Sequence, residues 1–275
     1  MLCVPCWPTT RYPVDDALHR FYTQEYDESV RLVRTSHGRL EAARTRELLA
    51  AALPQPPARI LDIGGGPGHH AQWMADEGYD VTLLDVVESH VLAARASGID
   101  ATVGDARRLE EPDGTVDAVL LLGPLYHLDD AGRAAALEEA HRVLRPGGLL
   151  AAAAISRWAA LIDIAATGSW NDDTVTRLTS IVDTGVHDTT VGFTTSWTHT
   201  PDQLDAEVTA AGFVDVDVIG IEGPLGHMVD HLEMPDTLDR AITVARITER
   251  EAALAGASPH LLALARRSRH TAASP

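Results

Sequence analysis

The chain has 275 residues and a formal net charge of −18, with 40 acidic residues against 22 basic ones. Every basic residue is an arginine, which excludes catalysis by a lysine amine, including Schiff-base chemistry. The acidic balance argues against a nucleic-acid partner, because phosphate backbones are held by Lys and Arg. No uncharged apolar run is long enough to span a membrane and no signal-peptide pattern opens the chain, so we expect a cytoplasmic protein without a membrane partner.

The first segment, residues 1–57, is predicted to form a helical cover over the rest of the protein. Aromatic residues at Phe21, Tyr22 and Tyr26 precede a helix expected near residues 40–53. The following Pro-Gln-Pro-Pro stretch ends that helix, because a residue before proline is steered away from helical geometry. We call this segment the cover.

From Ala58 onward, strands alternate with helical stretches, which is typical of a parallel sheet with right-handed crossovers. The first strand leads into Asp62 and then into the run Gly64-Gly65-Gly66-Pro67-Gly68, which we call the glycine turn. Glycines let the backbone approach a ligand where a Cβ would collide. A dinucleotide fingerprint needs a third glycine where this chain has His69, so that pattern is incomplete.

Four later segments follow in order. Asp85 ends the second strand, about 20 residues past the first glycine, where an acid can accept both ribose hydroxyls of several nucleotide cofactors. Gly104-Asp105-Ala106 follows a short third strand. The apolar run 116–122 reads as a buried fourth strand that opens into Gly123, and a Leu-Arg-Pro-Gly-Gly turn at 144–148 precedes a fifth strand.

With these motifs in this order, residues 59–155 resemble the class I S-adenosylmethionine (SAM)-dependent methyltransferases. The resemblance implies a Rossmann-like, doubly wound α/β fold whose seven-stranded sheet is mostly parallel and has an antiparallel last strand. It also implies SAM as cofactor, with an acid at position 105 bonding the adenine amino group. The residues expected to bind SAM are Asp62, Gly64, Gly65, Gly66, Gly68, Asp85, Val86, Gly104, Asp105, Ala106, Leu122 and Gly123.

The methyltransferase domain is predicted to run over residues 58–275 and to carry a lid insertion at about 157–200. Helices are expected at 157–166 and 172–184, followed by a threonine-rich stretch. Long insertions in compact domains are usually lids or binding loops, although the aromatic residues here would equally suit a small separate core. The residues expected to contact the substrate are Tyr22, Tyr26, Trp158, Trp197, His199 and His227.

The rest of the domain is expected to add a helix at 201–211, a strand at 214–221 and a helical stretch at 235–254. A final strand is expected at 261–265, and the tail from Arg266 onward is expected to be frayed.

His127, just beyond the fourth strand, is the best placed candidate for a general base, with Tyr126 beside it. A base would help if the acceptor is a hydroxyl or a protonated amine. The alternative is a structural contact beneath the cofactor. His69 and His70 open the helix after the glycine turn, where the helix dipole would keep them neutral, and we expect them to line the cofactor pocket.

No metal site is predicted. His227 and His231 are four residues apart and could ligate a metal on one helix face, with Glu222, Asp230 or Glu233 nearby. However, 13 histidines in one chain make such pairs common by chance. The Cys3–Cys6 pair cannot complete a zinc site alone, and no βαβ pattern surrounds it as a redox motif requires.

The predicted function is transfer of the SAM methyl group to an O, N or C atom of a small-molecule acceptor, as in bacterial secondary metabolism. The turn after the fourth strand lacks the Asn- or Asp-Pro-Pro-aromatic motif of nucleobase methyltransferases. The alternatives are an NAD(P)-dependent oxidoreductase, a non-catalytic SAM-binding protein, or a methyltransferase that acts on a peptide. The segments 38–41 and 256–262 resemble a largely uncharacterised branch, which names no acceptor. A monomer or homodimer is expected, and the sequence fixes neither the atom methylated nor a metal requirement.

Overall fold

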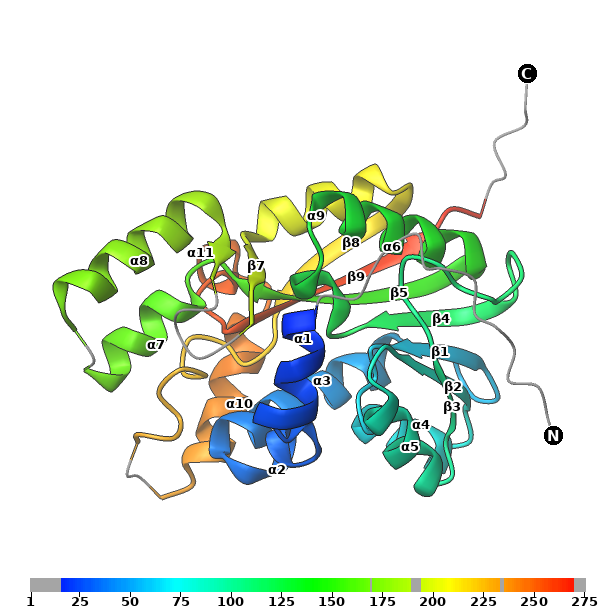
Figure 1. Ribbon diagram of the computed structural model, residues 1–275, viewed down its shortest axis with the longest axis horizontal. Coiled ribbons are helices and arrows are strands. Elements are labelled where there is room, and N and C mark those ends of the chain that lie inside the picture. The colour runs from blue at the N-terminus through cyan, green and yellow to red at the C-terminus, as the bar shows by residue number, and fades with distance from the viewer. Residues whose placement is uncertain (1–15, 169, 189–193, 233–234, 270–275) are drawn as a thin grey trace.

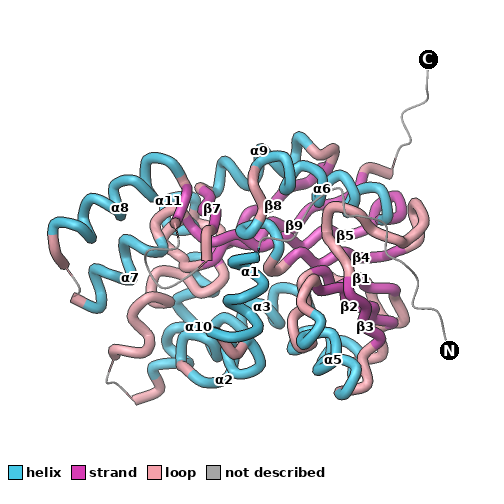
Figure 2. The backbone as a smooth tube through the Cα atoms, in the orientation of Figure 1, coloured by secondary structure: helices cyan, strands magenta, loops and turns pink. Residues whose placement is uncertain are grey.

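The computed structural model describes residues 16–168, 170–188, 194–232 and 235–269. Its core is one sheet with helices on both faces (Figure 1, Figure 2). Five parallel strands lie in the order β3-β2-β1-β4-β5. Their bounds are β1 Arg59–Ile63, β2 Asp80–Asp85, β3 Asp100–Val103, β4 Val116–Leu121 and β5 Leu144–Ser156.

The far side of β5 pairs with β9 (His260–Arg267), which is antiparallel to it, and β9 pairs in turn with antiparallel β8 (Phe213–Gly220). These seven strands confirm the predicted Rossmann-like fold. Two further strands, β6 (Val186–His187) and β7 (Ser196–His199), bring the sheet to nine. They arise because the insertion forms a short antiparallel pair whose β7 extends the end of β5.

The sheet is buried on both faces because alternate residues of each strand point to opposite sides. Leu61 and Leu121 belong to one apolar cluster with residues of α6 (Asp130–Val143) and α9 (Pro201–Ala210). Ile60 and Leu120 belong to a second cluster on the other face. Its helical members come from α3 (Ser36–Ala52), α4 (His69–Asp76) and α5 (Glu88–Ala96).

The described part of the cover is helical, as predicted. It comprises α1 (Asp16–Arg20), the short helices Phe21–Glu25 and Glu28–Val30, α2 (Arg31–Arg34) and α3. The helix α3 begins earlier than predicted because Thr35 caps it by accepting a hydrogen bond from the N–H of Gly38. Buried Arg44 then ties α3 to the rest of the protein by donating to Glu249 and to the carbonyl of Ile221.

The insertion places α7 (Ala159–Thr167) and α8 (Asp172–Thr184) at one end of the molecule, far from α4 and α5 (Figure 1). The predicted helix at 235–254 is two helices, α10 (Thr237–Thr248) and α11 (Ala252–Ala255). Residues 223–232 contain turns and no helix, so the helix face on which His227 and His231 could have ligated a metal is not formed. Cys3, Cys6, Phe193 and Glu233 lie outside the described residues.

The prediction that the tail frays from Arg266 onward was wrong for Arg266 and Arg267, because these two residues pair within the sheet. Among the described residues, no helix combines the length and apolar character needed to cross a membrane.

Candidate active site

The glycine turn follows β1 at the carboxyl edge of the sheet. Gly64, Gly66 and Gly68 have φ values of +69°, +57° and +94°, a left-handed region that side chains rarely adopt. A Cβ at Gly65 would stand 2.6 Å from Oδ2 of Asp62, so glycine is required there for a different reason, close approach. The sequence thus bends the backbone sharply at the end of β1, and the turn is tied to β2 because Gly64 and Gly65 donate their N–H groups to the carbonyl of Leu84.

Asp85, the last residue of β2, is fixed by two backbone amides. Its Oδ2 accepts the N–H of Gly66 at 2.9 Å and its Oδ1 accepts the N–H of Val87 at 2.8 Å. The carboxylate is therefore held beside the glycine turn, and its Oδ1 also lies 3.4 Å from Nδ1 of His90.

A cavity of about 320 Å³ lies over these two strand ends. This volume is at the lower end of the range, roughly 300–1,000 Å³, that is usual for small-molecule sites. All the residues predicted to bind SAM line it except Gly68, which instead caps α4. His69, His70, Tyr126 and His127 also line it, as does Tyr22 from the cover and Trp197 from β7.

Asp62 is almost completely buried, and within the described residues neither of its carboxylate oxygens has a hydrogen-bond partner. Burial, together with the nearby charge of Asp85, raises the pKa of Asp62 to about 7. A carboxyl group in this state would gain from a cation placed beside it. Asp62 therefore marks a point on the cavity wall where positive charge is favoured.

His69 and His70 are neutral, as predicted, although burial contributes most to this. Burial lowers the pKa of His69, and it lowers the pKa of His70 to about 3. These two rings therefore supply neutral, partly apolar surface to the cavity.

Asp105 carries an ion pair that the sequence analysis did not anticipate. Arg107, two residues further on, donates from Nε to Oδ1 at 2.9 Å and from Nη2 to Oδ2 at 2.6 Å. Both residues line the cavity. Arg107 thus orients the Asp105 carboxylate, and a hydrogen-bond donor from a ligand would share this carboxylate with Arg107.

The cover closes the cavity from above. The hydroxyl of Tyr22 lies 3.0 Å from Nε2 of His127, and burial raises the pKa of both Tyr22 and Tyr126 above the ordinary value. Glu28, Arg31 and Glu41 also line the cavity from the cover.

Three of these residues form a chain of ion pairs. Arg31 donates to Glu28 at 2.7 Å and to Glu41 at 2.5 Å. Burial opposes the charge of Glu41, but Arg31 nonetheless lowers its pKa.

Four residues expected to contact the substrate do not line the cavity. Tyr26 stacks on Phe21 with ring centroids 5.2 Å apart, and Trp158 lies against Gly256. His199 is buried in β7 beside Glu207. His227 is buried, and burial lowers its pKa to about 4.

Of the described insertion residues only Trp197 reaches the cavity, because α7 and α8 project away from it. Among the described residues, the cover therefore contributes more of the cavity wall than the insertion does.

Several lining residues were missed by the sequence analysis, among them Glu28, Arg31, His90, Ile221 and His260. The i, i+3 spacing of Glu28 and Arg31 was a visible signal of a helical ion pair. Ile221 and His260 gave no such signal, since their place follows from the pairing of β8 with β9.

Residues 60–148 match the family model described as "Methyltransferase domain". This segment contains the glycine turn, Asp85, Asp105 and His127. Residues 60–148 are a methyltransferase domain of the class I SAM-dependent family.

Two relatives match part of the chain. The chain is 36% identical over 112 residues to a ubiquinone/menaquinone biosynthesis C-methyltransferase of Acidiphilium cryptum, covering 38% of this chain and 44% of that protein. It is 31% identical over 130 residues to a ubiquinone biosynthesis O-methyltransferase of Xanthomonas oryzae pv. oryzae, covering 45% and 54%. The chain therefore spans about half the length of the curated relatives it matches.

The solved structure of a SAM-dependent methyltransferase from Thermotoga maritima, titled a possible histamine N-methyltransferase, superposes with a TM-score of 0.62. The match covers 92% of this chain and 100% of that one at 18% identity, which shows a shared fold.

SAM is the cofactor of this family, and the residues of the methyltransferase domain fit it. SAM has no pyrophosphate, so the site needs no cationic phosphate grip. The site needs an anion for the ribose diol of SAM and negative charge near the sulfonium and ammonium groups of SAM. The fixed carboxylate of Asp85 and the unpartnered carboxyl group of Asp62 meet these two needs.

Proposed function

We propose that the protein transfers the methyl group of SAM to an O, N or C atom of a small-molecule acceptor. The observation that carries this proposal is that all but one of the residues predicted to hold SAM line a single cavity together with the cover residues Tyr22 and Arg31. SAM supplies an activated methyl group on its sulfonium, and alignment of two reactants in one closed space can lower the barrier by roughly 7–11 kcal/mol.

Each cofactor contact has a proposed residue. Asp85 accepts the ribose hydroxyls, and Asp105 with Ala106 receives the adenine. The backbone of the glycine turn lies along the amino-acid end, where Asp62 faces positive charge. These roles agree with the cavity lining and with the two amides that orient Asp85.

The acceptor space is proposed to lie between the cover and the strand ends. Tyr22, Glu28, Arg31, Trp197 and Ile221 all line the cavity, and we propose that they surround the acceptor. Helices stand over the cavity, so a small molecule reaches it more readily than a folded macromolecule.

The atom that receives the methyl group is not set by the matching segment, since one relative is named a C-methyltransferase and the other an O-methyltransferase. We propose that His127 takes the acceptor proton if the acceptor is a hydroxyl or an ammonium group. His127 lines the cavity and its Nε2 contacts the hydroxyl of Tyr22.

The first test is a calorimetric titration of the purified protein with SAM, with its demethylated product and with NADH. SAM or its product is expected to bind in the micromolar range. Asp85→Ala should weaken binding about 100-fold, as loss of about 3 kcal/mol of charge-assisted hydrogen bonding would give.

The matched control is Asp80→Ala. Asp80 lies on the same strand but is exposed at its opposite end. Equal weakening by both changes would contradict the assigned cofactor site, and binding of NADH alone would support an oxidoreductase instead.

The second test is transfer of a radiolabelled methyl group from SAM to a panel of phenols, hydroquinones, amines and carboxylic acids. Product formation with any of them supports the proposal. Tight SAM binding without turnover on an exhaustive panel would favour a SAM-binding protein that is not an enzyme. Oligomeric state and cytoplasmic location stay predictions.

A further inference from the structure

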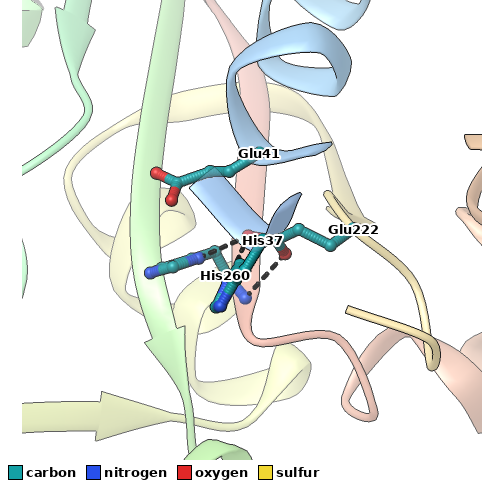
Figure 3. A group of neighbouring side chains, drawn as sticks. All are labelled: His37, Glu41, Glu222 and His260. Atoms are coloured by element: carbon teal, nitrogen blue, oxygen red, sulfur yellow. Dashed lines mark hydrogen bonds and ion pairs between the residues drawn. The ribbon is translucent and has the colours of Figure 1, made fainter. Parts of the chain in front are cut away.

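Four side chains from distant segments converge beside the cavity (Figure 3). His37 and Glu41 come from α3, Glu222 follows β8, and His260 begins β9. One nitrogen or oxygen of each lies within 4.8 Å of the corresponding atoms of the other three. Two imidazoles with two carboxylates form a donor set that suits divalent transition metals such as Zn²⁺ and Mn²⁺. We call these residues the His2Glu2 cluster.

Rigid elements place the four residues. His37 and Glu41 are one helical turn apart on α3, so their side chains lie on the same face. The antiparallel pairing of β8 with β9 sets Gly220 opposite Leu261 and thereby brings Glu222 beside His260. Three of the four residues thus lie on a helix or strand, and Glu222 lies two residues past the end of β8.

Outer hydrogen bonds orient the carboxylates. Oε2 of fully buried Glu222 accepts the hydroxyl of Ser258 at 2.8 Å and the backbone N–H of His260 at 3.1 Å. Its Oε1 is left facing Nδ1 of His260 at 2.5 Å. Glu41 is held in the same way by Arg31 at 2.5 Å. Protein metal sites use such second contacts to aim their ligands.

His37 supplies an independent sign of a missing partner. Its Nε2 is buried and has no hydrogen-bond partner among the residues that the structure describes. The nearest acceptor in the cluster, Oε1 of Glu222, is 3.9 Å away, which is too far for a hydrogen bond. Buried nitrogens are normally partnered, and a metal ion would use the lone pair of this one.

We propose that the His2Glu2 cluster binds one divalent transition-metal ion through one atom of each residue. The two carboxylates balance the charge of the ion. Glu41 and His260 also line the cavity, so the ion would face the acceptor space. If the proposed function holds, and only then, a hydroxyl oxygen of the acceptor would complete the coordination shell and become more acidic.

No metal site was predicted from the sequence, because the members of the cluster are far apart in the chain and only His37 and Glu41 have a ligand-like spacing. The competing account is that Glu222 forms ion pairs with protonated His260 and, at 3.9 Å, with protonated His37, and that no metal ion binds.

The test is a Zn²⁺ titration of the purified, tag-free protein, followed by calorimetry and by metal analysis after gel filtration. One Zn²⁺ per chain is expected, with Mg²⁺ binding far more weakly because it prefers oxygen ligands. His37→Ala and Glu41→Gln should each lower the Zn²⁺ affinity at least tenfold. Loss of the visible bands of bound Co²⁺ in His37→Ala gives a second readout.

Matched controls are His231→Ala and Glu251→Gln, which remove exposed residues of the same types outside the cluster. They should bind Zn²⁺ like the parent. Glu222→Gln carries a folding risk, whereas His37 is a third exposed and its substitution should leave the fold intact.

Absence of stoichiometric Zn²⁺ binding, or equal affinity in His37→Ala and His231→Ala, would overturn the proposal in favour of the ion pair. SAM binding, measured separately without metal, tells failure here apart from failure of the proposed function.

Discussion

The hydroxyl of Tyr22 and Nε2 of His127 lie 3.0 Å apart, although 105 residues separate them in the chain. Tyr22 belongs to the cover and His127 to the short helix Pro124–His127 that follows β4. The ring of Tyr22 also meets that of His90 edge-on, with centroids 5.7 Å apart. One tyrosine thus joins the cover to two segments at the carboxyl edge of the sheet.

Removal of this hydroxyl should affect turnover more than cofactor binding. Tyr22→Phe keeps the ring but leaves His127 without the hydrogen bond, which is worth about 1 kcal/mol. We expect SAM affinity within about threefold of the parent and a clear fall in kcat. His127→Ala should lower kcat about 100-fold or more, the range of general-base catalysis.

The control for this change is Tyr79→Phe. The hydroxyl of Tyr79 also makes a hydrogen bond of 3.0 Å, to the carbonyl of Pro54, but away from the cavity. Tyr79→Phe should lower the free energy of unfolding by about as much as Tyr22→Phe does, and it should leave kcat unchanged. If His127→Ala lost SAM binding in proportion to activity, His127 would be a structural contact and not a base.

A second prediction compares two glycines that both have a positive φ angle. Gly66 has φ +57° and Gly114 has φ +65°, so alanine at either position should cost about 1–2 kcal/mol of stability. Gly114 has open space around it, whereas a Cβ at Gly66 would approach Glu28 at 3.4 Å beside the cavity.

Urea unfolding should therefore show similar losses for Gly66→Ala and Gly114→Ala. Calorimetry should show weaker SAM binding, by tenfold or more, only for Gly66→Ala. Normal SAM affinity in Gly66→Ala would remove the glycine turn from the cofactor site.

A third prediction concerns the pH dependence of Asp62. Its folded pKa of about 7 lies above the ordinary value of 3.8. Between these values the folded chain holds a proton that the unfolded chain has lost, so stability falls as the pH rises through this window. Asp62→Asn should remove this dependence of stability on pH. At pH 8 the variant should be more stable than the parent by at most about 4 kcal/mol, since each pKa unit corresponds to about 1.4 kcal/mol.

The same substitution should weaken SAM binding at pH 8, because the ionised carboxylate is then lost as a partner for positive charge. In the parent, SAM affinity should rise with pH up to about the pKa of Asp62. Unfolding curves and SAM titrations at pH 5, 6, 7 and 8 measure both effects. A parallel pH profile in parent and Asp62→Asn would show that Asp62 does not titrate in this range.

The domain core could be predicted because its signals are local. The glycine turn, the carboxylates at strand ends and the apolar runs each occupy a few adjacent residues. Even the helix Asp172–Thr184 was predicted at its observed bounds, since Asn171 caps it and Gly185 ends it in left-handed geometry.

The acceptor side could not be predicted because it is built by tertiary contacts. Glu41 and His260 meet only after α3 has docked beside the β8–β9 pair, and no short-range pattern encodes that docking. The place of the described insertion residues depends on tertiary contacts in the same way. The position of the insertion after β5 suggested a lid, but β7 pairs with the end of β5 and carries His199 into the interior, while α7 and α8 point outward.

The last prediction concerns Glu207, which joins three elements. From α9 it accepts three hydrogen bonds from buried Arg133 of α6, at 2.8, 2.9 and 3.2 Å, and faces Nε2 of His199 at 3.3 Å. Burial opposes its charge, but the hydrogen bonds from His199 and Arg133 lower the pKa of Glu207 to about 2. Glu207→Gln would leave the Arg133 guanidinium paired only with the exposed carboxylate of Asp130, at a cost of about 2 kcal/mol at pH 7.

The pH dependence separates this charge effect from a packing defect. Because the folded pKa of Glu207 is lowered, its contribution is fully present above the unfolded value near 4.5 and is lost as the pH falls toward 2. The stability gap between parent and Glu207→Gln, measured by urea unfolding, should therefore be constant from pH 7 to 5 and shrink by pH 3. Glu138→Gln, an exposed change on α6, should show no gap at any pH. A gap for Glu207→Gln that persisted unchanged at pH 3 would mean that shape, and not charge, makes Glu207 important.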